Sequence, residues 1–319
     1  MRTMVWLLWK QYRFELASVA LAIGALTVAA VWITLRLDEI RPLPECLEYW
    51  MENGENGPGC EDVRPWLRRL EEEAGQITGL LLFIPMIGGI LLGSVLVSRE
   101  IEHRTAQLSW SLSASRRRWL AERVLPVAAL LAVLLGALSI AAELLQGARD
   151  PSVDPRATLE GYGLRGLPLV SRGLAVFSGA VLLGALFGRQ LPALILALAV
   201  SVAGAWAILG AFPYGAPTEW TASDGGGNLM EIPEGSRAVG YGLRSEDGTI
   251  LTWDEAYAAV PPGLSDPEQW IYRNLTPVQE VVRAEHLLQI ELRESSILLA
   301  GAGLALLGTF LVVDRRRPY

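Results

Sequence analysis

The fold of this chain is decided by residues 98–120, which read SREIEHRTAQLSWSLSASRRRWL. This stretch is strongly polar, yet the chain on either side of it is apolar over lengths that cross a lipid bilayer. We therefore expect residues 98–120 to connect two membrane spans as a polar excursion. It is the one long excursion that the topology derived below leaves in the cytoplasm, so a soluble partner would bind there.

The composition places the chain among membrane proteins. Of its 319 residues, 51% are hydrophobic, and the mean hydropathy of +0.33 is too high for a soluble domain with one ordinary core. The net charge of −7 argues against binding to nucleic acid. The expected fold is an all-α, multi-pass membrane protein.

Six segments are apolar over the roughly 20 residues that a membrane-spanning helix needs. The predicted spans are residues 15–36, 77–98, 124–146, 167–188, 189–212 and 296–313. Only Gly188, Arg189 and Gln190 join the apolar runs of the fourth and fifth spans, so the two form a tight helical hairpin. A cleaved signal peptide is the alternative for the first span, but that apolar run is too long and lacks a cleavage site.

The distribution of basic residues orients these spans, because cytoplasmic segments are enriched in Lys and Arg. Basic residues gather in residues 1–14, 99–123 and 314–319 and at Arg189, all on one side if there are six spans. Both termini are therefore predicted to be cytoplasmic. The segments 37–76, 147–166 and 213–295 are predicted to be external, and the first and last of these are acidic.

Residues 1–14 carry Trp6, Trp9 and Tyr12 among polar neighbours. This pattern is typical of a short helix that lies in the membrane interface with its aromatic rings among the lipid headgroups. The alternative is that these residues only extend the first span.

The external segments contain both cysteines and one predicted small domain. Cys46 and Cys60 lie close together in an acidic loop rich in Pro and Gly, which favours an outward-facing disulfide over two unrelated thiols. Residues 213–295 carry turn signals around short apolar runs and predict a small external domain, with disorder at 222–228 as an alternative. From Pro277 onward, apolar residues recur at helical spacing and predict an amphipathic helix that leads into the sixth span.

Several enzyme chemistries lack their residues in this chain. The single lysine, Lys10, follows Trp9, so no Gly-x4-Gly-Lys phosphate-binding loop exists. The two histidines, His103 and His286, are predicted on opposite sides of the membrane and form no zinc motif. We therefore expect no catalytic residue, no metal ligand and no cofactor bound by this chain.

Two ionisable residues lie deepest in the predicted spans, and both are nearer the outer end. Glu143 and Arg172 belong to the third and fourth spans, which a short external loop joins, so they are predicted to pair. Such a pair either fixes the two helices or lies along a substrate path. Glycines at four-residue spacing, Gly89 with Gly93 and Gly184 with Gly188, favour close helix packing, within the chain rather than between copies.

Two motifs carry a resemblance to a known family. The first is Trp6-x-x-Trp9-Lys10-Gln11-Tyr12-Arg13-x-Glu15. The second is Arg99-Glu100-Ile101-Glu102-His103-Arg104-Thr105-x-x-Leu108-x-Trp110-Ser111-x-Ser113-x-Ser115-Arg116-x-Arg118-Trp119. Together with the span order and the basic tail, they resemble the permease subunits of type-2 ABC exporters, particularly the actinobacterial variety. Relatives often carry glycine at the position of Arg104.

The resemblance implies a coupling helix between spans two and three that inserts into a groove of a separate ATPase. The coupling residues it implies are Glu100, Glu102, Arg104, Thr105, Leu108, Trp110, Arg116, Arg117 and Arg118. For Arg116 to Arg118 the alternative is plain positive-inside anchoring, and for Trp110 it is an interfacial anchor. ATP and Mg would be bound by the ATPase, and a second permease protomer would complete a homodimer, with a heterodimer left open.

The resulting hypothesis is the permease subunit of an ABC exporter in the cell membrane of a prokaryote, which moves a hydrophobic or amphipathic substrate outward. The alternative is a non-transporting sensor or binding protein with an acidic external domain. An intramembrane enzyme requires a catalytic group that none of these motifs contains.

Overall fold

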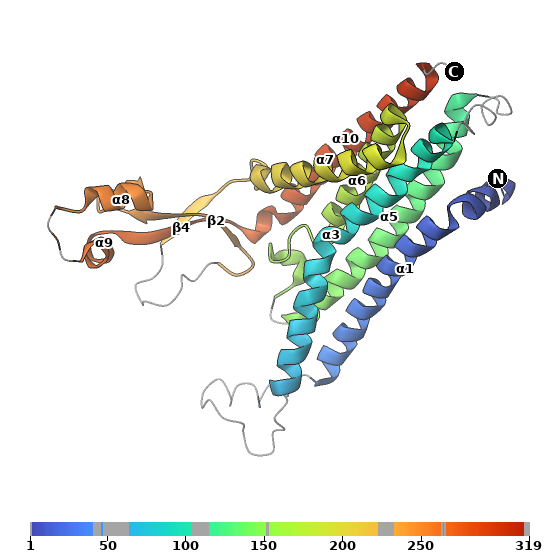
Figure 1. Ribbon diagram of the computed structural model, residues 1–319. Coiled ribbons are helices and arrows are strands. Elements are labelled where there is room, and N and C mark those ends of the chain that lie inside the picture. Colours follow the sequence, from blue (N-terminus) through green and yellow to red (C-terminus); the bar gives the residue numbers. More distant parts are fainter. Residues whose placement is uncertain are drawn as a thin grey trace. The chain divides into compact units, whose positions relative to one another are not determined.

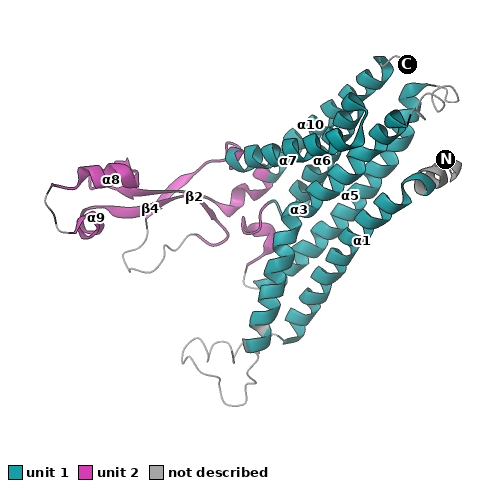
Figure 2. Ribbon diagram, viewed as in Figure 1, with its two compact units in different colours: residues 1–151, 163–210, 291–319 teal, residues 152–162, 211–290 magenta. Residues whose placement is uncertain are grey.

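The computed structural model describes residues 2–40, 46, 64–103, 115–150, 153–222, 233–262, 264 and 266–315, and of residues 2–9, 64 and 67 only the backbone. The chain divides into two compact units (Figure 2). The first comprises residues 1–151, 163–210 and 291–319, and the second comprises residues 152–162 and 211–290. The first unit is helical, and the second carries a β-sheet.

Within the described residues, six long helices confirm the six predicted spans. They are α1 (Arg2–Ile40), α3 (Arg64–Glu102), α5 (Arg116–Arg149), α6 (Gly166–Phe187), α7 (Gln190–Ala211) and α10 (Leu287–Arg315) (Figure 1). All six are long and apolar enough to cross a membrane. Each predicted span lies within one of these helices to within a residue, because a long apolar run has no other way to satisfy its backbone in lipid.

Local signals explain where the helices begin, end and break. The Ser115 side chain caps α5 by accepting a hydrogen bond from the Arg118 amide at 3.2 Å. Gly188 ends α6 in the left-handed conformation, with φ of 63°, and so opens the predicted hairpin to α7. Within α1, Tyr12 has non-helical angles (φ −118°, ψ 20°), so the helix breaks near the predicted end of the N-terminal segment. That this segment lies in the membrane interface stays a prediction.

The helices of the first unit bury one face and expose another that is equally apolar. On α5, Leu131, Leu135 and Leu138 are fully buried, whereas Val133 and Ile140 are largely exposed. Exposed apolar side chains on this scale are unfavourable in water, but they cost nothing against lipid tails. The exposed face of α5 therefore suits contact with the bilayer.

Glycines bring α3 and α6 into direct backbone contact. A Cβ atom on Gly89 would lie 2.9 Å from the carbonyl oxygen of Gly173, and one on Gly93 would lie 2.8 Å from the Cβ of Ala180. A Cβ on Gly184 would likewise lie 3.0 Å from the carbonyl oxygen of Ser94. The glycine spacing in the sequence therefore serves packing within the chain.

The second unit is built on a four-stranded antiparallel sheet of order β1-β4-β2-β3. Its strands are β1 (Glu219–Ala222), β2 (Arg237–Arg244), β3 (Ile250–Leu251) and β4 (Thr276–Val282). Two short helices, α8 (Trp253–Ala259) and α9 (Pro267–Asn274), lie between β3 and β4, and the 3-10 turns η1 (Pro155–Ala157) and η2 (Ala284–His286) complete the unit. Leu243, Ala256, Ile271 and Leu275 form a small core beneath α8 and α9.

The predicted amphipathic helix from Pro277 is wrong over its first half. Residues Thr276–Val282 form the inner strand β4, and the α10 helix begins only at Leu287. Val278, Val281 and Val282 are all fully buried, because β4 is paired on both edges and covered on both faces. These buried positions have the i, i+3 and i+4 spacing of a helix, which explains the wrong prediction. The residue type, β-branched valine, favours a strand.

The predicted disulfide is not tested by these residues. Cys46 is described, but Cys60 lies outside the described residues, so the pairing stays a prediction.

The contact between α3 and α6 is expected to be sensitive to a single methyl group. Gly93→Ala places a Cβ against Ala180 and the Phe177 carbonyl, and it should destabilise the protein by about 1–3 kcal/mol through overpacking. Gly79→Ala on the same helix is the matched control, because a Cβ there would meet nothing within 4 Å. This variant should not destabilise the protein. Thermal unfolding in detergent measures both, and equal melting temperatures would contradict the close packing.

The α8 helix is expected to loosen in acid. Its capping box joins Thr252 and Glu255, and the pKa of Glu255 lies below its ordinary value because the amide and hydroxyl of Thr252 donate to the carboxylate. A carboxylate with a depressed pKa stabilises the fold above its unfolded pKa of about 4.3, and this contribution is lost as the pH falls through the folded pKa.

Hydrogen exchange checks this expectation. Protection of residues 253–259 should fall below about pH 4 in the wild type. In Glu255→Gln, whose amide does not titrate, the acid-dependent loss should disappear. A wild type that shows the same acid response as Glu255→Gln would show that the carboxylate does not hold the cap.

Candidate functional site

One end of the first unit gathers the ends of several helices (Figure 1). Hydrogen bonds there join the start of α1 to the end of α3, the end of α3 to the starts of α5 and α7, and the start of α5 to the end of α10. The segments predicted to be cytoplasmic therefore meet at one end. That this end faces the cytoplasm stays a prediction.

Glu100 is the centre of a buried network at this end. Its carboxylate accepts hydrogen bonds from Arg123 Nε at 2.9 Å, Gln11 Nε2 at 3.1 Å and Tyr12 Oη at 3.4 Å, and only 2% of the residue is exposed. The Arg123 guanidinium also lies 4.5 Å from the ring centre of Trp119. These contacts tie α1, α3 and α5 together.

The coupling role of Glu100 stays a prediction, and the structure places this side chain inside the unit. A coupling residue has to present its side chain to a partner, but this carboxylate is enclosed by its own helices. The family resemblance placed both Glu100 and Glu102 at the coupling surface, by their positions in the motif. On a helix, a separation of two residues turns the two side chains toward different faces.

The Glu102 side chain is exposed, and it has a different partner from that of Glu100. It is the last residue of α3, and its Oε2 accepts a hydrogen bond from the backbone amide of Gln190 at 2.9 Å. Gln190 begins α7, so a carboxylate lies at the positive N-terminal end of that helix. The end of α3 is thereby bonded to the start of α7.

The predicted coupling arginines mostly bind their own chain. Arg116 donates to the carbonyl oxygens of Val313 and Asp314 at 3.4 and 3.1 Å, and Arg117 pairs with the Asp314 carboxylate at 2.8 Å. Cations at the C-terminal end of α10 match its dipole. Arg118 pairs with Glu122 on its own helix.

The remaining predicted coupling residues are Arg104, Thr105, Leu108 and Trp110. They lie outside the described residues, which stop at His103 and resume at Ser115. A coupling helix in this interval therefore stays a prediction.

Arg172, for which Glu143 was the predicted partner, binds a different carboxylate. Arg172 forms a bidentate ion pair with Glu294 of α10, at 2.6 Å from Nε to Oε1 and 3.2 Å from Nη2 to Oε2. Its Nη1 donates to the Gly163 carbonyl at 3.0 Å, and the adjacent Ser171 bonds Ser295.

Sequence reasoning chose Glu143 because a short loop joins its helix to that of Arg172. The preferred carboxylate instead comes from a helix 122 residues away. Glu294 lies just before the sixth span, at the same predicted outer end as Arg172, but Glu143 lies at that predicted end too.

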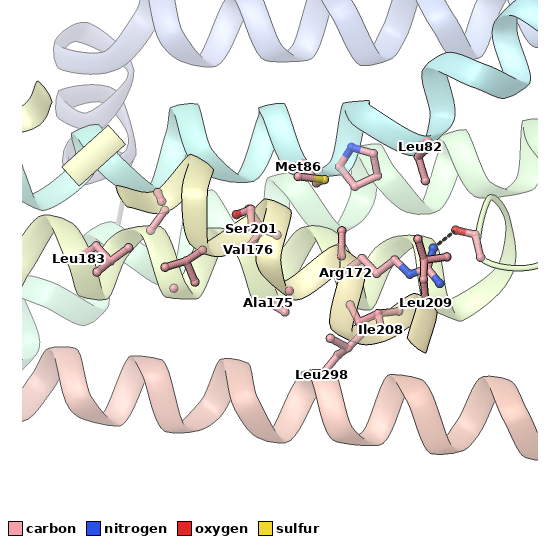
Figure 3. A pocket seen from close by; sticks show the side chains of 18 of the residues that line it. Leu82, Met86, Arg172, Ala175, Val176, Leu183, Ser201, Ile208, Leu209 and Leu298 are labelled. Carbon is pink, nitrogen blue, oxygen red and sulfur yellow. Dashed lines mark hydrogen bonds between the residues drawn. The ribbon is translucent and has the colours of Figure 1, made fainter. Parts of the chain in front are cut away.

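A cavity of about 220 Å³ opens between α3, α6 and α7 within the first unit (Figure 3). Leu82 and Met86 line it from α3, Val176 from α6 and Ser201 from α7, and Leu298 of α10 also contributes. The lining is almost wholly apolar, and Arg172 lies at one end. No sequence motif marked this cavity, because it is made of ordinary span residues.

The Glu100 network is expected to be essential for stability. Glu100→Ala leaves Arg123 buried without its carboxylate and should cost about 3–5 kcal/mol. Combining it with Arg123→Met should recover part of that loss, since no buried charge then remains. Glu15→Ala, which breaks the more exposed Arg99–Glu15 pair, is the control and should cost less than about 1 kcal/mol. Thermal unfolding in detergent ranks the variants, and equal losses for Glu100→Ala and Glu15→Ala would refute the network.

Comparison with known proteins completes the description of this site. A family model described as ABC-2 membrane transporter related matches residues 16–212, which is more than half of the chain. None of the curated proteins or solved structures compared with the chain matches it. The matched region runs from the first span through the fifth and includes the junction between α3 and α5. The chain therefore belongs to the ABC-2 membrane transporter related family.

Proposed function

We propose that this chain is the transmembrane subunit of an ABC exporter, which couples ATP hydrolysis by a separate ATPase to outward movement of a hydrophobic or amphipathic substrate. The family and the six spans support a membrane transport protein. The ATPase, its ATP and Mg, the direction of transport and the substrate belong to the proposal.

The observation that carries the proposal is the way in which the two flanks of residues 104–114 are bonded. On one side, Glu102 binds the start of α7, and on the other, Arg116 and Arg117 bind the end of α10. A partner that moves the intervening segment would therefore act on two helices through these hydrogen bonds and this ion pair. This is the arrangement that an ATPase needs in order to act on the spans.

The proposed complex contains two copies of this chain and two ATPase subunits in the cell membrane of a prokaryote, with both termini of each permease in the cytoplasm. ATP binding would draw the ATPases together and favour one of two packings of the spans. Such coupling requires that the ATPase bind the two packings with different affinities. The acidic second unit lies outside the cell in this arrangement.

Copurification tests the proposal. The wild-type chain extracted from native membranes under mild conditions should carry an ATPase, identified by mass spectrometry and by ATP hydrolysis. Trp110→Ala in the predicted coupling segment should reduce the recovered ATPase by about tenfold, which corresponds to 1.4 kcal/mol of binding. Trp66→Ala is the control, since Trp66 is exposed and lies on α3 at the predicted external end.

The outcome separates the two functions under consideration. An ATPase that follows the wild type and Trp66→Ala, but not Trp110→Ala, supports the transporter. A chain that brings down no ATPase, with Trp110→Ala behaving as wild type, would reject it and favour a non-transporting sensor.

A further inference from the structure

The cavity between α3, α6 and α7 has the length of one lipid chain. In Figure 3 it runs from Leu183 at one end to Arg172 and Leu209 at the other. On α7 its lining extends from Ala197 to Leu209, which is about 18 Å of helix. One leaflet of a bilayer contributes about 15 Å of hydrocarbon. The cavity therefore matches the depth of a single leaflet.

The room in the cavity comes from missing side chains. Gly179 of α6 and Gly204 of α7 both line it, and a Cβ atom at either position would meet nothing within 4 Å. Ala175 and Ala205 widen it further. The glycines at the contact between α3 and α6 have no such space. We call the cavity between α3, α6 and α7 the slot.

The polar groups of the slot are neutralised or uncharged. Arg172 is paired with the almost fully buried Glu294 and with the Gly163 carbonyl, so its positive charge is balanced at the end of the slot. Ser201 is the other polar side chain in the lining. A charged molecule would find no ionic partner in the apolar part of this cavity, whereas an aliphatic chain needs none.

The slot also lies behind a weakly packed helix. Only Ala193 and Ala197 of α7 are buried, whereas Trp206 and Leu209 expose large apolar surfaces. Since α7 is apolar enough to span the membrane, that surface suits contact with lipid tails. Acyl chains are therefore the most abundant apolar molecules at the wall of the cavity.

We infer that this slot binds one acyl chain of a membrane lipid, with the polar end of the lipid at the level of Arg172. The ligand is an uncharged aliphatic chain that lies along α7 between Gly179 and Gly204. The inference narrows the cargo to an acyl-bearing amphiphile, and that part rests on the proposed transport function. Binding of the chain itself does not.

Photochemical labelling tests the inference on the full-length chain in phosphatidylcholine nanodiscs. The probe is a phosphatidylcholine with a diazirine in its palmitoyl chain, and labelled residues are located by mass spectrometry. Labelling of Met86 and Ser201 is expected in the wild type. It should fall about tenfold in Gly179→Leu and in Gly204→Leu, whose side chains occupy the slot.

Controls separate the slot from the general lipid surface. Trp206 is exposed on α7 and does not line the cavity, so its labelling should stay constant in every variant. Gly136→Leu on α5, where a Cβ also meets nothing within 4 Å, should leave labelling of the slot unchanged. If either glycine variant lowers the melting temperature, Ser201→Leu replaces it, and labelling of Met86 is then measured.

The possible results point in clear directions. The inference that the slot binds an acyl chain would be overturned by either of two results. One is that Met86 and Ser201 are not labelled in the wild type, and the other is that the filling variants do not reduce their labelling. Because labelling needs no ATPase, a labelled slot without a copurified ATPase would keep the lipid site and reject transport. A copurified ATPase with no labelled slot would keep the transport proposal and reject the lipid site.

Discussion

The pairing of buried charges holds this helical unit together. The carboxylate of Glu100 meets Arg123 at one end of the unit, and that of Glu294 meets Arg172 in the other part of the bundle. Each pair joins helices that the chain does not hold together by a short loop: α3 with α5, and α6 with α10. Apolar faces alone do not select neighbours in a membrane, because lipid tails satisfy them equally well. A buried charge without its partner is costly, so these pairs select which helices meet.

A second set of bonds relates the helix ends beside residues 104–114 to the cavity. Glu102 binds the start of α7, and Arg116 and Arg117 bind the end of α10, so both flanks of the polar segment are attached to helices that line the cavity. The α3 helix lines it as well and ends at Glu102. The cavity is thus bounded by the helices whose ends a partner at residues 104–114 would displace. Close glycine contacts keep α3 against α6, which leaves α7 as the wall with the fewest buried residues.

Prediction succeeded where one residue type or one apolar run decides the outcome, and failed where a partner had to be chosen. The spans, the hairpin at Gly188 and the break near Tyr12 follow from local rules of length, capping and polarity. The carboxylate partner of Arg172 did not follow, because nothing local distinguishes Glu143 from Glu294. The valines of β4 carry a spacing that suits a helix and a doubly covered strand alike, and only pairing with β1 and β2 selects the strand.

The sequence by itself determined the membrane class, the six spans and the place of the polar segment between α3 and α5. It could do so because transfer from water to lipid is decided residue by residue and summed along the chain. Tertiary structure alone decided that Glu100 is buried, that Glu294 neutralises Arg172 and that a slot remains beside Gly179 and Gly204. These features depend on which helix faces which, and that choice is made by packing and charge pairing between residues far apart in the chain.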